Sequence, residues 1–294
     1  MNKKNAEKKK YIPWIFIPCV VVYILEFVLT IFVMQGSIVY AIGTFDGNTW
    51  DELVDYVMDI VMSSATDGWI FVLYSSIGIV LFSICYHRMF MEGKTYRLKG
   101  ISKNVPMTVG GLVLLCIGMQ YVSEFLMDSL SAAFPSWLEE YIEIFEAAGF
   151  DGDVSLLLIL YVLLLGPIVE EIIFRGIVYS AAKKVMPYYF AIIVQALLFG
   201  AFHMNPIQSC YAFVLGLGMG YVMYLYDNLL LSIIIHISYN IMGVFFSGTI
   251  SFGEGNIVGF FFYTLFALVV TYIGLLLLKK GANSVKEEEN LADI

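Results

Sequence analysis

Three ionisable residues stand within a stretch that is otherwise apolar, 166-GPIVEEIIFRG-176. An ionisable side chain at the centre of a membrane helix costs about 2.5–3.5 kcal/mol, so these groups must face a protein interior or a wet cavity. Glu171 and Arg175 are four residues apart and can pair on one helix face. Glu170 points about 100° away and has Phe174 at its own i+4 position. We therefore expect Glu170 to be the candidate base and Glu171 to be the structural partner of Arg175.

Two of the three histidines lie in apolar stretches further along the chain. His203 ends 199-FGAFH-203, where Phe199 lies one turn earlier on the same face. His236 opens 236-HISYN-240, and Asn240 projects with it into the same space. A hydrogen-bonded polar contact between helices explains either histidine as well as a functional role does, and the residues alone leave both interpretations open.

The composition shows what kind of structure must position these groups. The 294 residues are 60% hydrophobic and 14% charged, against about 45–50% and 25% in soluble domains, which excludes a water-soluble globular protein. Seven apolar stretches approach the roughly 20 residues that cross a bilayer, and an eighth contains the glutamates. They are 12–34, 69–86, 105–127, 154–185, 188–203, 207–226, 229–247 and 257–278. The sequence predicts an all-α membrane bundle of eight helices, one domain over 1–294, with its motifs in 154–247.

The Lys and Arg residues predict the orientation. Fifteen of the sixteen lie in the N-terminal tail, the 87–104 loop, positions 183–184 and the C-terminal tail, whereas 35–68 and 128–153 contain none. Cytoplasmic loops accumulate these residues, so we expect a multi-pass protein of the cell membrane with both termini in the cytoplasm. Its basic face suits an anionic lipid bilayer. The formal net charge of -9 argues against a nucleic-acid partner.

The expected depth of the motifs places them near one another. Glu170 is 15 residues from Val185 and His203 is 15 residues from Tyr188, about 22 Å along each helix. His236 is only seven residues into its own helix, about 12 Å shallower unless tilt or an off-centre turn narrows the gap. All three positions fall in the middle or the cytoplasmic half of the membrane. We therefore expect a common site in an intramembrane cavity that opens to the cytoplasmic side.

The three motifs together resemble those of the CPBP family of intramembrane proteases. That family includes CAAX prenyl endopeptidases of the Rce1 type and bacteriocin-processing and immunity proteins. The order EExxxR, FxxxH, HxxxN, each on its own apolar helix, stands here as Glu170-Glu171-Ile-Ile-Phe-Arg175, Phe199-Gly-Ala-Phe-His203 and His236-Ile-Ser-Tyr-Asn240. The resemblance covers about 154–247, and the first 150 residues add only their helix count to it.

The resemblance implies a reaction and a role for each motif. Glu170 and His203 would activate a water molecule for peptide hydrolysis, while His236 and Asn240 would hold the oxyanion; Glu171, Arg175 and Phe199 would support them. The chemistry is consistent, because a carboxylate beside an imidazole can deprotonate water and a His with an amide can donate to developing charge. The substrate would be a membrane-associated peptide or protein, with a prenylated CAAX protein as one possibility.

Several alternatives stay open at this point. Glu170, His203 and His236 could hold zinc with an open fourth position, although we expect no cofactor because no HExxH motif is present. A non-proteolytic scaffold or bacteriocin self-immunity protein would retain the same residues in an idle site. Intramembrane Glu and His also relay protons in transporters, but no inverted repeat is visible.

Three further features bear on the site. The segment 135–146 has aromatic and aliphatic residues on one face and carboxylates on the other, which predicts a short amphipathic helix at the outer interface. Gly166-Pro167 would kink or loosen the helix just before the glutamates. Glu26 and Glu124 also lie in apolar stretches, Glu124 near the outer interface, and we expect neither to be catalytic.

Overall fold

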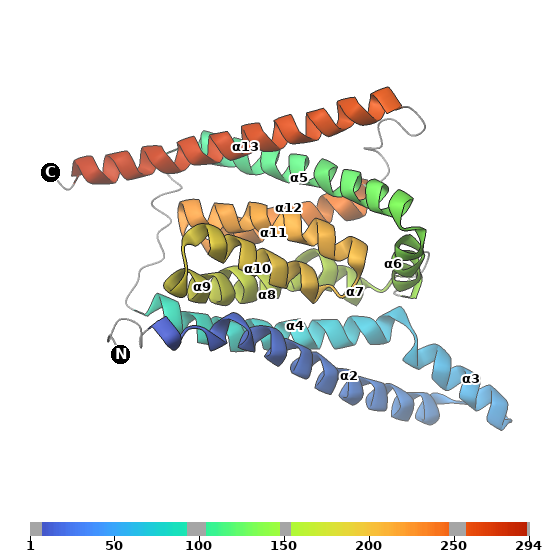
Figure 1. The fold of residues 1–294 in the computed structure, drawn as a ribbon. Helices are drawn as coiled ribbons and strands as arrows, with labels where there is room; N and C mark the ends of the chain where they lie inside the picture. Colours follow the sequence, from blue (N-terminus) through green and yellow to red (C-terminus); the bar gives the residue numbers. More distant parts are fainter. Residues whose placement is uncertain (1–7, 93–103, 148–153, 247–256, 293–294) are drawn as a thin grey trace.

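A computed structural model describes residues 8–92, 104–147, 154–246 and 257–292 of the chain, and within these ranges the regular elements are all helical. The helices pack side by side into one elongated bundle (Figure 1). In chain order they are η1 (Pro13–Ile15), α2 (Ile17–Thr44), α3 (Trp50–Val61), α4 (Ser64–Tyr86), η2 (His87–Met91), α5 (Val105–Ala133), α6 (Pro135–Ala147), α7 (Leu156–Leu160), η3 (Tyr161–Leu165), α8 (Gly166–Glu171), η4 (Ile172–Val178), α9 (Tyr179–Val185), α10 (Tyr188–Phe202), α11 (Pro206–Tyr226), α12 (Leu229–Phe246) and α13 (Ile257–Ala292).

A helix lies over each of the eight predicted apolar stretches, and the all-α membrane bundle is confirmed. Of the described helices, six are long and apolar enough to cross a bilayer individually. The other two, α10 and α12, are apolar but shorter. The 15 residues of α10 span about 22 Å, less than the roughly 30 Å of a hydrocarbon core. The protein is therefore a multi-pass membrane protein with two short helices inside its bundle.

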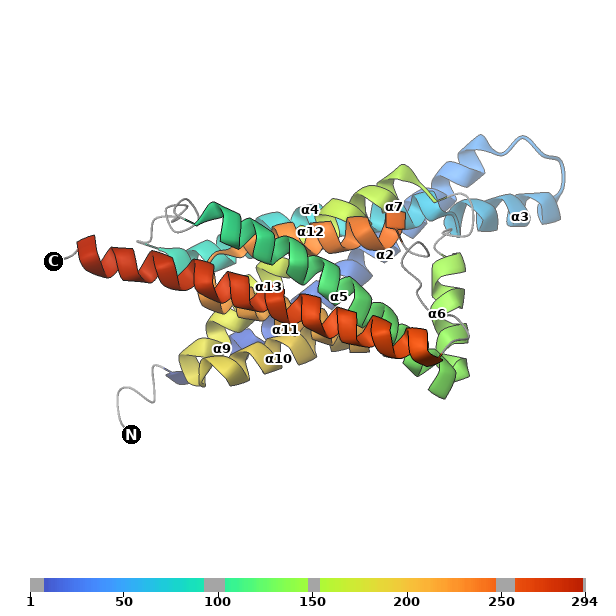
Figure 2. The ribbon, with the colours of Figure 1, turned by 90° about the horizontal axis from the view of Figure 1, so that it is seen from above.

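The helix that carries the glutamates runs from Leu156 to Val185 as α7, η3, α8, η4 and α9 without a break. It packs against α4 on one side and against α10 and α12 on the other. Helices α5 and α13 form a long pair along one face of the bundle (Figures 1 and 2). Both chain termini lie at the same end of the molecule, and α3 and α6 lie at the opposite end, which we call the far end (Figure 2).

The far end holds two amphipathic helices. The predicted helix over 135–146 is present as α6. Helix α3 lies within 35–68, where the sequence predicts no membrane-spanning helix. Its start carries a capping box, in which Thr49 accepts from the backbone N–H of Glu52 while Glu52 accepts from that of Thr49. Hydrogen bonds from the backbone N–H groups of Asn48 and Thr49 lower the pKa of the Glu52 carboxyl.

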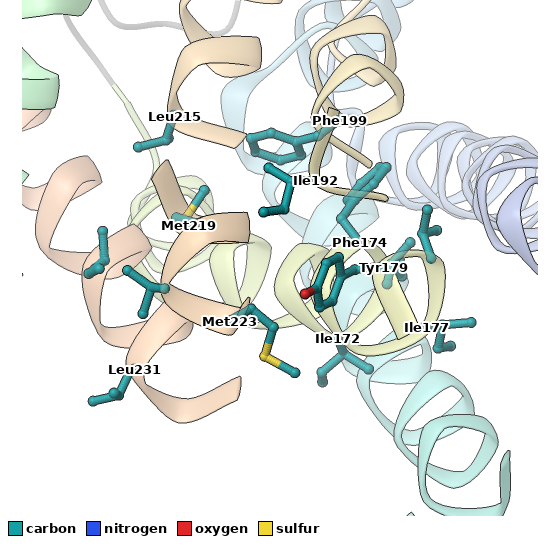
Figure 3. Packing of buried hydrophobic residues seen from close by; sticks show 14 of the residues in the cluster. Ile172, Phe174, Ile177, Tyr179, Ile192, Phe199, Leu215, Met219, Met223 and Leu231 are labelled. Carbon is teal, nitrogen blue, oxygen red and sulfur yellow. The ribbon is translucent and has the colours of Figure 1, made fainter. Parts of the chain in front are cut away.

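The half of the bundle nearer the termini is filled by apolar side chains. This apolar cluster includes Phe174, Ile177, Met219, Met223 and Leu231, from the glutamate-bearing helix, α11 and α12 (Figure 3). Each of them has 3% or less of its surface exposed. Interiors packed in this way leave few voids as large as a water molecule. Beyond Glu170 toward the termini, the centre of the bundle is therefore a mainly apolar core.

The glutamate-bearing helix is locally widened on both sides of its ionisable residues. Tyr161–Leu165 and Ile172–Val178 are π-helical and flank α8. Pro167 has no N–H, so it cannot donate to the Val162 carbonyl five residues earlier. Asn240 of α12 donates to that carbonyl instead, at 2.7 Å. The loosening predicted at Gly166-Pro167 thus takes the form of a π-helical segment, a feature that often marks functional sites.

Candidate active site

Glu171 is the centre of a buried polar network. Arg175 Nη1 lies 2.8 Å from Glu171 Oε1, and both side chains are 0% exposed, which confirms the predicted i, i+4 ion pair. His236 Nδ1 also lies 2.9 Å from Glu171 Oε1. Ser232 Oγ donates a short hydrogen bond to the other carboxylate oxygen. Burial of a charge is tolerated when it is paired and hydrogen-bonded, and Glu171 meets both conditions.

The same network orients His236 toward Glu170. A carboxylate can only accept, so the 2.9 Å contact places the proton of His236 on Nδ1. Its Nε2 atom then points toward Glu170, whose Oε2 lies 3.7 Å away. That distance is longer than a hydrogen bond and leaves the Glu170 carboxylate facing the cavity described below. Glu171 is therefore held by an ion pair and hydrogen bonds, whereas Glu170 has no such partner among the described residues, as the helix geometry predicts.

The start of α12 explains how His236 reaches the level of Glu170. Leu229, the first residue of α12, lies beside Gly176 of the glutamate-bearing helix, nine residues before Val185. Those nine residues correspond to about 13 Å of rise. Helix α12 therefore begins about 13 Å deeper in the bundle than the level of Val185. This compensates for the difference in depth of about 12 Å between His236 and Glu170 that would be expected if α12 began at the level of Val185.

His203 directly follows the last residue of α10, where its backbone N–H caps the helix end. Its Nδ1 lies 2.9 Å from the backbone carbonyl of Phe199. Because a carbonyl only accepts, Nδ1 is protonated and Nε2 carries a lone pair when the ring is neutral. Both histidines thus have Nδ1 fixed by a neighbouring oxygen.

Phe199 lies against several of these groups and is itself fully buried. The guanidinium carbon of Arg175 lies 4.2 Å from the centre of its ring, a cation–π contact. Its ring also meets the rings of His203 and His236 edge to face, at centroid distances of 5.0 Å and 5.7 Å. Phe199 therefore holds the side chains of three motifs in register.

Glu170, His203, His236 and Asn240 all line one cavity of about 740 Å³. It extends from Glu170 toward the far end of the bundle. The side chains that line it are Tyr23 and Glu26 of α2, Phe71 of α4, Gln120, Ser123, Glu124 and Met127 of α5, Tyr141 and Phe145 of α6, residues 161, 162, 166, 167 and 170 of the glutamate-bearing helix, residues 199 and 202–204, Gln208, Tyr211, Ala212 and Leu215 of α11, and residues 236, 239, 240, 243 and 244 of α12.

The cavity lies in the half of the bundle away from the termini, whereas the sequence predicts that the termini and the opening of the cavity share the cytoplasmic side. On the glutamate-bearing helix its lining residues lie between Tyr161 and Glu170, in the half nearer α6. On α12 they lie between His236 and Val244, again in the half away from the termini. The reason is packing, because the apolar core fills the opposite half of the bundle.

Glu170, His203 and His236 have the donor atoms of a zinc site but not its arrangement. Imidazole nitrogens and a carboxylate are usual zinc ligands. However, no three His, Cys, Asp or Glu side chains converge as metal ligands in the part of the chain that the structure describes. Glu170, His203 and His236 do not fit a zinc site in this arrangement, and the reaction considered below uses the side chains alone.

Sequence reasoning missed Ser232. It lies four residues before His236 and eight before Asn240, so the three share one face of α12. That helical spacing was the available signal, but a serine in an apolar stretch is too common to stand out. The structure shows that Ser232 is 0% exposed and bonded to Glu171.

Ser232→Ala is expected to leave a carboxylate oxygen of Glu171 without its donor. An unsatisfied buried group costs about 1–3 kcal/mol, so the free energy of unfolding should fall by about that amount. Chemical unfolding of the purified protein in detergent measures it. Ser209→Ala, which removes a half-buried hydroxyl of α11, is the matched control. Equal stability of the two variants would show that the Ser232–Glu171 bond contributes nothing.

Comparison with known proteins is informative for the motif-bearing part of the chain. Residues 152–242 match the family model described as type II CAAX prenyl endopeptidase Rce1-like. The matched range contains all three motifs and Ser232, and it ends within α12. No curated protein and no solved structure matches the chain.

Proposed function

We propose, from the Rce1-like domain that the chain carries at residues 152–242, that this membrane protein is a glutamate-dependent endopeptidase of a membrane-associated peptide or protein. The observation that supports it most directly is the placement of Glu170. Its carboxylate faces a cavity inside the bundle, next to His236 and without the ion pair that engages Glu171. We also propose that the protein resides in the cell membrane with both termini in the cytoplasm.

The chemistry assigned to the side chains is hydrolysis by an activated water molecule. Glu170 takes a proton from water as the water oxygen attacks the scissile carbonyl carbon, and the Nε2 lone pair of His203 orients that water. The resulting tetrahedral oxyanion accepts hydrogen bonds. Glu170 then returns the proton to the leaving nitrogen as the C–N bond breaks. The products are one new carboxyl group and one new amine.

We infer that two groups of α12 donate to the oxyanion. Asn240 uses one N–H of its amide for the Val162 carbonyl, and an amide has a second one. His236 would donate through Nε2 when that atom carries a proton, and Nε2 lies 3.7 Å from Glu170 Oε2. A donor fixed before the reaction costs no reorganisation when charge develops, which is how such groups accelerate acyl transfer.

A cleavage assay separates this proposal from the other classes of protein. The purified protein is incubated in detergent micelles with a peptide library and with membrane proteins of its host, and new peptide ends are identified by mass spectrometry. An endopeptidase produces them. A scaffold, an immunity protein or a transporter produces none, and that outcome would overturn the proposal.

A chelator is expected to leave the cleavage rate unchanged, because the described side chains that could bind zinc do not converge on one position. The assay compares the rate before and after dialysis against EDTA or 1,10-phenanthroline. A rate that falls at least tenfold with the chelator and returns on addition of zinc would instead establish a metallopeptidase.

A further inference from the structure

We propose that the cavity receives its substrate from the far end of the bundle, and that the substrate is an extended peptide segment with basic side chains. With the termini in the cytoplasm, the far end faces the opposite side of the membrane. The inference rests on the proposed function for its reaction, but the route into the cavity can be tested without any cleavage.

Buried side chains fill the centre of the bundle between Glu170 and the terminal end. Phe174 and Ile177 follow Glu170 on its helix and are 0% exposed. Met219 and Met223 of α11 belong to the same apolar cluster and are 1% exposed or less (Figure 3). Arg175 and Glu171, in the same layer, are held in their ion pair. A peptide coming from the terminal end would have to displace this core.

On the side away from the terminal end, the cavity extends to α6 and to exposed surface. Tyr141 and Phe145 of α6 line it, and that helix lies across the far end (Figure 2). Met204, in the turn between α10 and α11, also lines it and is 76% exposed. The cavity that contains Glu170 therefore extends to α6 and reaches exposed surface at Met204.

The charged side chains in the wall of the cavity are acidic. The acidic side chains that line the cavity are Glu26, Glu124 and Glu170, and no Lys or Arg of the described residues lines it. Helix α3 at the far end continues this sign, because it carries four carboxylates and no Lys or Arg. A cleft with walls of one sign concentrates ligands of the opposite sign. A peptide with Lys or Arg side chains fits these walls.

The wall of the cavity contains an unsatisfied hydrogen-bond acceptor. Gln120 of α5 lines the cavity and is only 6% exposed, yet its Oε1 atom has no partner among the described residues. An extended peptide inside a membrane carries unpaired backbone N–H groups. One such group bonded to Gln120 satisfies both partners at once. Gln120 is thus placed to position an extended chain beside Glu170.

The route is tested by thiol labelling in intact cells. In a background with the four native cysteines replaced by Ala, single cysteines are introduced at Gln208 in the cavity wall, Asp51 at the far end and Lys279 at the terminal end. A membrane-impermeant maleimide added outside is expected to label Gln208→Cys and Asp51→Cys, and Lys279→Cys only after permeabilisation. Labelling of Gln208→Cys together with Lys279→Cys, or from neither side, would overturn the proposed route.

The charge preference is tested with two peptide libraries that differ only in having Lys or Glu at their charged positions. The wild type is expected to cut the Lys library about tenfold faster, and Glu26→Gln/Glu124→Gln to reduce this ratio. Equal rates, or faster cutting of the Glu library, would overturn the preference. If neither library nor any membrane protein is cut, the proposed function fails, while the labelling result still decides the route.

Discussion

Glu170→Gln is expected to reduce the cleavage rate by about 10²–10⁴-fold, the usual contribution of a general acid–base group. The substitution keeps the size of the side chain, replaces one acceptor oxygen by an NH2 donor and removes the ability to take a proton from water. The measurement is kcat/KM for one peptide identified as a substrate, with wild type and variant purified in the same detergent.

Two control variants make this result specific. Glu140 is exposed on α6 and does not line the cavity, so Glu140→Gln should keep the wild-type rate. Thermal unfolding of Glu170→Gln should match that of the wild type or exceed it, because burial of a charged carboxylate is unfavourable. A Glu170→Gln protein that is folded and cuts at the wild-type rate would remove Glu170 from the reaction.

Arg175→Met is expected to lower the free energy of unfolding by about 3–5 kcal/mol, the cost of leaving one partner of a buried ion pair uncompensated. Glu171 and Arg175 are both 0% exposed, and methionine fills most of the arginine volume without its charge. The loss also affects the cation–π contact with Phe199, whose ring meets both histidines. Chemical unfolding in detergent and the amount of protein in the membrane both measure this effect.

The reverse experiment shows whether charge is the cause. Glu171→Gln/Arg175→Met removes both charges and should recover a large part of the lost stability, because no buried ion is then left unpaired. Lys183→Met is the matched control, since Lys183 and Asp227 form an ion pair at 2.7 Å whose side chains are 30% and 62% exposed. Breaking that exposed pair should cost less than about 1 kcal/mol. Equal losses in Arg175→Met and Lys183→Met would contradict the account.

The site could be predicted from sequence because charged residues are rare in membrane-spanning stretches and those that occur there usually have a function. Glu170, Glu171 and Arg175 stand out in an apolar stretch, and their helical spacing already separates the paired glutamate from the free one. The structure confirms that ion pair and brings His203 and His236 to the same cavity. Their roles in a reaction stay predictions.

Other properties depend on packing that spacing alone does not show. The depth of His236 follows from the position of Leu229 beside Gly176, and thus from how two helices fit together. The direction of the cavity follows from which half of the bundle is filled by side chains such as Phe174 and Met223. Helix α3 has a sequence signal in the capping box of Thr49 and Glu52, but it is amphipathic and lies outside the apolar stretches that predict the membrane helices.

The central claim is that Glu170 hydrolyses peptide bonds inside this bundle, and one measurement tests it most directly. Wild type, Glu170→Gln and Glu140→Gln are incubated in parallel with host membrane proteins in water enriched in ¹⁸O, and new C-termini are identified by mass spectrometry. The account predicts ¹⁸O-labelled ends with wild type and Glu140→Gln and none above background with Glu170→Gln. The same ends at equal yield with Glu170→Gln, or none with the wild type, would contradict it.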